Sequence, residues 1–264
     1  MTRIPFAQID AFADRPFTGN PAAVMLLENW LADDVLQAIA AENNLSETAF
    51  LVPDDSGAAD YALRWFTPAV EVALCGHATL ASGHLVLASD PARDRVTFST
   101  RRAGILSVAR DGEGYAMALP AYPPKPVETP DLLAALGVDT GETLRHPAGY
   151  DLTVLADAEA VLALRPDVRA LAALGDTLNI VTAPGRDTDV ISRVFAPAAG
   201  IDEDPVTGSA HCVLTPYWAA RLGRPRFTAF QASARGGYLD CEVASDSVVL
   251  RGRAVTVIEG SFLL

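Results

Sequence analysis

Two segments of the sequence place an ionisable side chain at the same distance from a short Phe- and Pro-containing motif. In Phe66-Thr67-Pro68-Ala69 the ninth residue after the Phe is Cys75, and in Phe195-Ala196-Pro197-Ala198 the ninth residue after the Phe is Asp204. A Gly-containing segment and then an apolar run follow each ionisable residue, which predicts a helix start at both places. The matched spacing predicts a duplicated fold that holds one ligand between two helix N-termini.

The first predicted helix start offers a thiol and an imidazole. Cys75 is followed by Gly76 and His77. A helix N-terminus lowers the pKa of a thiol, which favours thiolate chemistry, and a His at this place can transfer a proton or bind a carboxylate. A buried inert Cys and a His that bonds to backbone are the common structural roles of these residue types, and they remain open here.

The second predicted helix start offers a carboxylate and a hydroxyl. Asp204 precedes Pro205, and Ser209 follows Gly208. Asp is a standard N-cap residue and Pro is favoured at the first helical position, so an N-cap role for Asp204 has strong support. The alternative is a binding role, in which backbone amides near Gly208 and the Ser209 hydroxyl hold a substrate carboxylate.

Glu47 stands at the beginning of a strand-like apolar segment that extends to Val52. A partly buried Glu has a raised pKa and suits general acid–base chemistry near neutral pH. A solvated turn residue, or a capping partner of Ser46, is the commoner role for a Glu in such a place. The residue types alone leave both roles open.

Composition narrows the class of protein. The chain has 264 residues, long enough for two domains, and half of them are apolar while 20% are charged. The net charge of −13 (20 basic minus 33 acidic residues) argues against a nucleic-acid partner. Three cysteines favour a reducing, cytoplasmic environment over a disulfide framework. The sequence contains no zinc-binding motif, no signal peptide and no long apolar span. We therefore expect no metal site and no membrane segment.

The pattern of apolar and turn residues predicts two sets of elements joined by a proline-rich linker at 121–130. We expect long helices at 32–43, 76–88 and 206–222, of which the second is apolar nearly all round and therefore buried. Pro216 should kink or break the third helix. Short helices are predicted at 131–136 and 168–174, and most other segments read as strands with antiparallel order. Each half should wrap these strands around its long buried helix.

Four motifs in this order resemble the PhzF-like isomerases of the phenazine-biosynthesis superfamily. They are Gly19 to Val24, Ser46 to Phe50, Cys75 to Thr79 and Glu203 to His211, and the resemblance covers nearly the whole chain. It implies an α+β fold of two pseudo-symmetric hot-dog-like domains, each an antiparallel β-barrel around a central helix, as in diaminopimelate epimerase. The implied domains are 1–120 and 121–256, with 257–264 returning to the first.

The resemblance also implies an activity: cofactor-independent isomerisation of a small carboxylic acid in the cleft between the domains, with Glu47 as the acid–base group. No cofactor and no metal are implied, and the family is commonly homodimeric. Matching motifs assign catalytic roles to Glu47, His77, Asp204 and Ser209, and substrate binding to Asn20, Cys75, Gly76 and Gly208.

Two departures keep other functions open. Cys75 and Gly76 precede His77 where the phenazine enzyme differs, and Asp204 takes the place of the second thiol of two-cysteine epimerases. One alternative is therefore an epimerase, racemase or dehydratase that uses Cys75 and Asp204 as opposed acid–base groups. The other is a non-catalytic binding protein that kept the fold, because fold alone does not determine activity.

Overall fold

The computed structural model describes residues 2–264, and the chain folds into two compact units. The first unit comprises the residues up to Ala118 together with Arg251–Leu264, and the second comprises Leu119–Leu250. The chain therefore leaves the first unit once and returns to it at its C-terminal end. Within the described residues, no helix combines the length and apolar character needed to cross a membrane.

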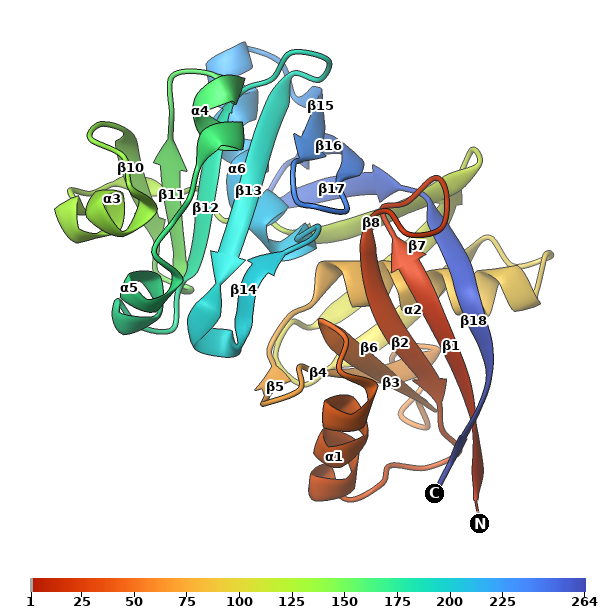
Figure 1. Cartoon of the computed structure of the whole chain (residues 1–264). Coiled ribbons are helices and arrows are strands. Elements are labelled where there is room, and N and C mark those ends of the chain that lie inside the picture. The colour runs from red at the N-terminus through yellow and green to blue at the C-terminus, as the bar shows by residue number, and fades with distance from the viewer. Residues whose placement is uncertain (1) are drawn as a thin grey trace. The chain divides into compact units, whose positions relative to one another are not determined.

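The first unit contains a sheet, a long buried helix and a second helix on the sheet's other face (Figure 1). Its elements are β1 (Arg3–Ala11), β2 (Asn20–Leu26), α1 (Asp33–Asn43), β3 (Glu47–Pro53), β4 (Tyr61–Phe66), β5 (Glu71–Val72), α2 (Gly76–Ser89), β6 (Arg95–Thr100), β7 (Ile105–Asp111), β8 (Gly114–Pro120), which runs into the second unit, and β18 (Ala254–Leu263).

The second unit follows the same plan with shorter outer helices. Its elements are β9 (Lys125–Pro126), α3 (Pro130–Leu136), β10 (Glu142–His146), β11 (Tyr150–Val154), α4 (Ala158–Ala163), α5 (Val168–Ala173), β12 (Leu178–Pro184), β13 (Val190–Ala196), the 3₁₀ turn η1 (Pro197–Ala199), β14 (Ile201–Asp204), α6 (Gly208–Leu222), β15 (Arg226–Gln231), β16 (Gly237–Ala244) and β17 (Ser247–Gly252).

Strand pairing repeats from one unit to the other. In the first unit β1–β2, β3–β4 and β6–β7 pair antiparallel, while β2–β3 and β4–β6 pair parallel. In the second unit β10–β11, β12–β13 and β15–β16 are antiparallel, while β11–β12 and β13–β15 are parallel. This repeat confirms the duplication at the level of topology.

The prediction of antiparallel order holds only in part, because both units also contain parallel strand pairs. Each parallel pair has a helix between its two strands in the sequence, and a helical crossover returns the chain to run in the same direction. The outer strand of each unit is antiparallel to its neighbour, β18 to β1 and β9 to β10. Closure of either sheet into a hot-dog barrel stays a prediction.

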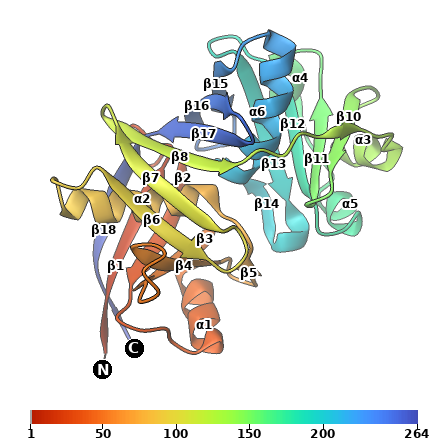
Figure 2. The same cartoon turned by 180° about the vertical axis from the view of Figure 1, so that it is seen from behind.

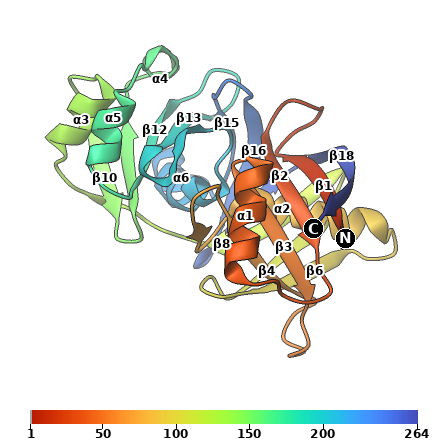
Figure 3. The ribbon, with the colours of Figure 1, turned by 60° about the horizontal axis from the view of Figure 1, so that its bottom comes forward.

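Helix α2 is buried along most of its length, as its apolar sequence predicts. It contacts β1, β2, β3, β6, β7 and β18 of its own unit, and Figure 2 shows β6, β7 and β8 side by side near it. A Cβ atom at Gly83 would lie only 2.4 Å from Val108 of β7, so the glycine permits the close approach of helix and strand. The opposite layer is α1, which packs on β3 and β4 (Figure 3).

Helix α6 continues through Pro216, so the predicted break is absent. Proline has no N–H, and its place in the helix leaves the carbonyl of Cys212 without its usual partner four residues on. The backbone N–H of Tyr122, from the linker, donates to that carbonyl at 2.9 Å. The lost helical hydrogen bond is thereby replaced, and the helix ends only at Gly223, which has the positive φ of a C-cap residue.

Candidate functional site

The turn before β2 delivers Asn20 to the N-terminus of α2. Gly19 has φ +64°, and a Cβ atom there would lie 2.2 Å from the carbonyl oxygen of Ala11, so only glycine fits. The buried carboxylate of Asp10 accepts the backbone N–H of Phe17 at 2.8 Å and holds the turn in place. Asn20, the first residue of β2, is fully buried.

Glu47, His77, Asn20 and Cys75 come together in the first unit. Oε2 of Glu47, the first residue of β3, lies 3.2 Å from Nε2 of His77. The other ring nitrogen, Nδ1, is 3.1 Å from Nδ2 of Asn20 and 3.6 Å from Sγ of Cys75. His77 is 2% exposed and Glu47 is 9% exposed, so both side chains are buried.

The ring of His77 is neutral at physiological pH. Burial lowers the pKa of His77 to about 3, because the charged form would lose its hydration. An amide nitrogen only donates, so Nδ1 accepts from Asn20 and the ring proton lies on Nε2, the atom nearest Glu47. Asn20 therefore fixes the tautomer that presents an N–H beside the Glu47 carboxyl group.

Cys75 is the N-cap residue of α2, and its side chain makes no capping hydrogen bond. The first amides of an α-helix have no intrahelical acceptor and carry the positive end of the helix dipole. The predicted binding residue Gly76 is the first residue of this turn. An anionic group next to Gly76 would therefore find amide donors together with the Glu47–His77 pair.

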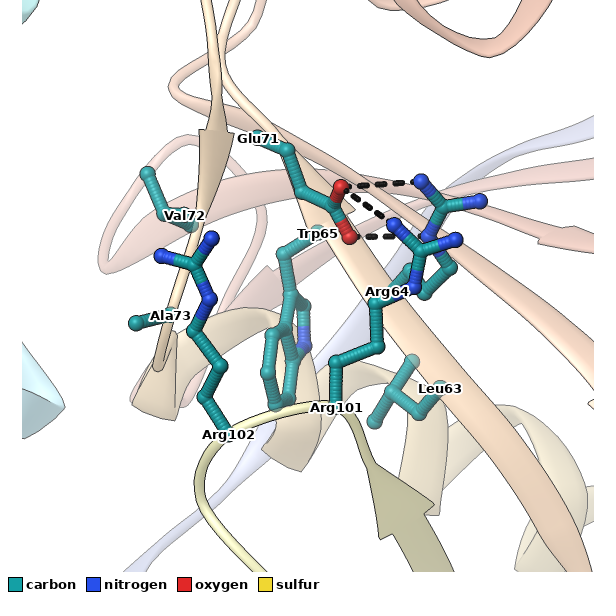
Figure 4. A pocket seen from close by; sticks show the side chains of 8 residues that line it. All are labelled: Leu63, Arg64, Trp65, Glu71, Val72, Ala73, Arg101 and Arg102. Carbon is teal, nitrogen blue, oxygen red and sulfur yellow. Dashed lines mark hydrogen bonds and ion pairs between the residues drawn. The ribbon is translucent and has the colours of Figure 1, made fainter. Parts of the chain in front are cut away.

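An ion cluster anchors the strand that leads into α2. Arg64, 4% exposed at its side chain, donates from Nε and Nη2 to the two oxygens of Glu71, both at 2.8 Å, and from Nη1 to Asp33. Arg101 also contacts Glu71, at 3.0 Å (Figure 4). Since Glu71 begins β5 and Cys75 follows only four positions later, this cluster positions the start of the helix.

The second helix start differs from its prediction. Asp204 ends β14, and the N-cap residue of α6 is Thr207, so Asp204 does not cap the helix and Pro205 is not its first residue. Cys75 therefore corresponds to Thr207, not to Asp204. The equal nine-residue spacing is misleading, because the 3₁₀ turn η1 and β14 lengthen the second segment by three residues.

Gln231 joins Asp204 to the start of α6. This fully buried side chain accepts the N–H of Thr207 at 2.8 Å, and its amide nitrogen donates to the backbone oxygen of Asp204 at 2.8 Å and to Oγ1 of Thr207 at 3.0 Å. The Thr207 hydroxyl then donates to the Asp204 carboxylate. Sequence reasoning missed Gln231, which lies at the end of β15, because only the strand register reveals its place.

The remaining residues of this helix start have unequal roles. Gly208 and Ser209 open α6, and the Ser209 side chain is buried. His211 donates from Nδ1 to the Thr207 carbonyl at 2.8 Å, and burial lowers the pKa of His211 to about 4. His211 is therefore a neutral packing residue.

The predicted site residues thus form two groups. Glu47, His77, Asn20, Cys75 and Gly76 gather around the start of α2, and the others gather around the start of α6: Asp204, Gly208 and Ser209. That both groups bind the same ligand stays a prediction.

Comparison with known proteins identifies the family. The duplicated topology and the paired helix starts define a fold of the PhzF and diaminopimelate epimerase kind. A sequence profile described as "Phenazine biosynthesis-like protein" matches residues 9–260, so the chain belongs to this family. An uncharacterised isomerase of Pseudomonas aeruginosa is 51% identical, over 97% of this chain and 98% of the relative.

Solved structures agree with this assignment. A PhzF-family protein of Enterococcus faecalis matches with a TM-score of 0.91 and 43% identity, over the full length of both chains. A hydroxyproline epimerase of Agrobacterium vitis has a TM-score of 0.64 at 14% identity, over 98% of this chain and 92% of that one, which shows a shared fold alone. The relatives above 40% identity that are named as uncharacterised isomerases support an enzyme of isomerase type.

Proposed function

We propose that the protein is a cofactor-independent isomerase that moves a proton on a small carboxylic acid, with Glu47 as the general acid–base. The observation that carries the proposal is the contact between the enclosed Glu47 carboxyl group and the neutral ring of His77, 3.2 Å away. A neutral neighbour orients the carboxyl group without the full charge compensation that a cation would bring. A carboxyl group in such a place suits general acid–base chemistry.

The reaction conserves the atoms of the substrate. Glu47 removes a proton from a carbon that is conjugated with the substrate carboxyl group, and the C–H electron pair moves into the conjugated system. The negative charge then develops on the carboxyl oxygens, where the amides at Gly76 and His77 stabilise it. The carboxyl proton of Glu47 exchanges with solvent, the protonated Glu47 then delivers a proton to a different carbon, and the double bond shifts.

The proposal gives the second group a binding role. The amides at Gly208 and the hydroxyl of Ser209 would hold a substrate oxygen, and Asp204 would accept a hydroxyl or amino group of the substrate. Support comes from the rigid setting of Asp204, whose carboxylate is tied to Thr207 and, through it, to Gln231.

A thiol-dependent epimerase is the second candidate. It is favoured by the position of Cys75, whose Sγ lies 3.6 Å from Nδ1 of His77, a nitrogen with a lone pair. The corresponding N-cap residue of α6 is Thr207, so a mechanism with two thiols has no second thiol at the equivalent place. In this mechanism Asp204 would be the opposed group, and Cys75→Ser would abolish turnover.

The test is a screen of small unsaturated and hydroxylated carboxylic acids in D₂O, with solvent deuterium incorporation followed by NMR. We expect the wild-type protein to label one acid and Glu47→Gln to lose labelling by about 10²-fold or more, while the acid still binds in calorimetry. Glu42→Gln, an exposed glutamate on α1, is the matched control and should label normally.

Two results would contradict the proposal. Near-normal labelling by Glu47→Gln would remove Glu47 from the mechanism. Tight binding of an acid by the wild-type protein, without any labelling or product, would favour a binding protein that lacks the reaction.

A further inference from the structure

Glu47, Cys75 and His77 carry the three kinds of side chain that bind zinc in proteins: a carboxylate, a thiol and an imidazole. Among residues 2–264 they form the only group of three or more such side chains close enough to share an ion. We propose that these three residues bind a divalent ion of borderline softness, Zn²⁺ above all, and that the bound ion inhibits the enzyme.

The distances suit a shared ion. One potential ligand atom from each residue lies within 4.8 Å of the other two. A tetrahedral zinc ion with bonds of about 2.0–2.3 Å separates neighbouring ligand atoms by roughly 3.3–3.7 Å. The contact of 3.2 Å between Glu47 Oε2 and His77 Nε2 is close to this value. Cys75 Sγ, which now lies 3.6 Å from Nδ1, completes the set once its side chain rotates towards Nε2 and Oε2.

The contact between Glu47 and His77 also favours a metal ion bound by both side chains. His77 Nε2 is buried and makes no hydrogen bond, although it lies 3.2 Å from the carboxylate oxygen. The nitrogen and the oxygen thus lie at a distance that two ligands of one ion also have. A metal ion that accepts both lone pairs satisfies the buried nitrogen.

Asn20 supplies the support that a zinc-bound histidine requires. Coordination through Nε2 moves the ring proton to Nδ1, which then needs an acceptor. Asn20 lies 3.1 Å from Nδ1, and a rotation of its amide by 180° replaces the donor nitrogen by the acceptor oxygen. The same residue thus serves the proton-transfer form and the metal-bound form.

The protonation states favour binding near neutral pH. Because burial keeps the His77 ring neutral, binding through Nε2 needs only the shift of the ring proton to Nδ1 and no loss of a proton from the ring to solvent. With Glu47 in its carboxylate form, binding replaces the thiol proton of Cys75. Each ion that binds therefore releases one proton to solvent.

Inhibition follows because the ion occupies the carboxylate oxygen that removes the substrate proton. This consequence rests on the proposed function, whereas metal binding itself does not. The two are distinguishable, since binding is measured without substrate and labelling is measured with a chelator present. A failure of either measurement leaves the other one intact.

The experiment titrates the full-length protein with Zn²⁺ by calorimetry and with Co²⁺ by absorption spectroscopy. We expect one ion per chain, an intense thiolate-to-cobalt absorption band, and about one proton released in buffers of different ionisation enthalpy. Cys75→Ser should remove the band, and Asn20→Ala should weaken Zn²⁺ binding about 10–100-fold. Cys241→Ala, which removes a buried thiol of the second unit, should retain the band and is the matched control.

Either of two results overturns the proposal. One is binding of Zn²⁺ by the wild-type protein no tighter than by the folded His77→Gln variant, with folding verified by circular dichroism. The other is a cobalt spectrum in which the thiolate band is missing, or in which it persists in Cys75→Ser.

Discussion

The N-termini of α2 and α6 have equivalent places in the two units and carry different side chains. At α2 the sequence Cys75-Gly76-His77 sits beside Glu47, and at α6 the sequence Thr207-Gly208-Ser209 sits beside Asp204. The first carboxyl group contacts a titratable ring, whereas the second accepts a hydroxyl that is itself held by Gln231. Duplication thus preserved the helix starts and separated their chemistry: proton transfer is proposed at the first and fixed recognition at the second.

Both helices also bury a histidine, and the pH dependence of the unfolding free energy should report on both. The pKa of His77 is lowered to about 3 and that of His211 to about 4, both from an ordinary 6.5. The unfolded chain therefore binds more protons below pH 6.5, and stability that is complete above this pH is lost as the pH falls towards 4. We expect up to about 1.4 kcal/mol of lost unfolding free energy per pH unit for each histidine.

Denaturant unfolding between pH 7.5 and 4 measures this loss. The His77→Gln and His211→Gln variants should each show a flatter pH dependence than the wild-type protein. A slope that neither substitution changes would contradict the assignment of both rings as buried and neutral.

Gln231→Ala tests the start of α6, where hydrogen bonds hold Asp204 and Thr207 in place. The substitution leaves the Thr207 N–H and the Asp204 carbonyl without their partner in a buried place, which should cost about 2–4 kcal/mol of unfolding free energy. The second unit should lose more protection from hydrogen exchange than the first. Gln37→Ala, which removes a single hydrogen bond to the Thr67 carbonyl, is the control and should cost about 1 kcal/mol. Equal costs for the two variants would argue against a special role for Gln231.

The smallest expected effect concerns the ion cluster that precedes α2. The hydrogen bond from Arg64 holds the pKa of Glu71 below its ordinary value, so its stabilisation is present above that value and is lost as the pH falls through the lowered pKa. Because Glu71 is partly exposed, we expect Glu71→Gln to cost about 1 kcal/mol at pH 7 and less at pH 3. The surface pair of Glu113 and Arg253 provides the control, and Glu113→Gln should have almost no effect at either pH.

Local patterns predicted the elements whose formation depends on nearby residues. The buried helix α2 follows from its continuous apolar sequence. Long-range contacts decided the rest. The Asp-Pro signal predicted a helix start at Asp204, but Gln231 and the extra turn η1 move the start to Gly208. Pro216 stays helical because a distant linker residue, Tyr122, occupies the carbonyl that it frees.

The identity of the candidate residues was predictable from the sequence, whereas their contacts were not. Glu47, His77 and Asp204 were identified from motifs, because those motifs resemble a known family. The tautomer of His77 was not predictable, since it depends on Asn20, which lies 57 positions earlier in the sequence. The error at Asp204 arose from equal sequence spacing, which does not reveal an inserted turn.

The most direct test of the division between the two helix starts compares Glu47→Gln with Asp204→Asn on the acid that the wild-type protein labels in D₂O. We expect Glu47→Gln to bind the acid and not label it, and Asp204→Asn to bind it at least tenfold more weakly while it still labels at saturation. Labelling by Glu47→Gln at the wild-type rate, together with loss of labelling in Asp204→Asn at saturation, would contradict the account.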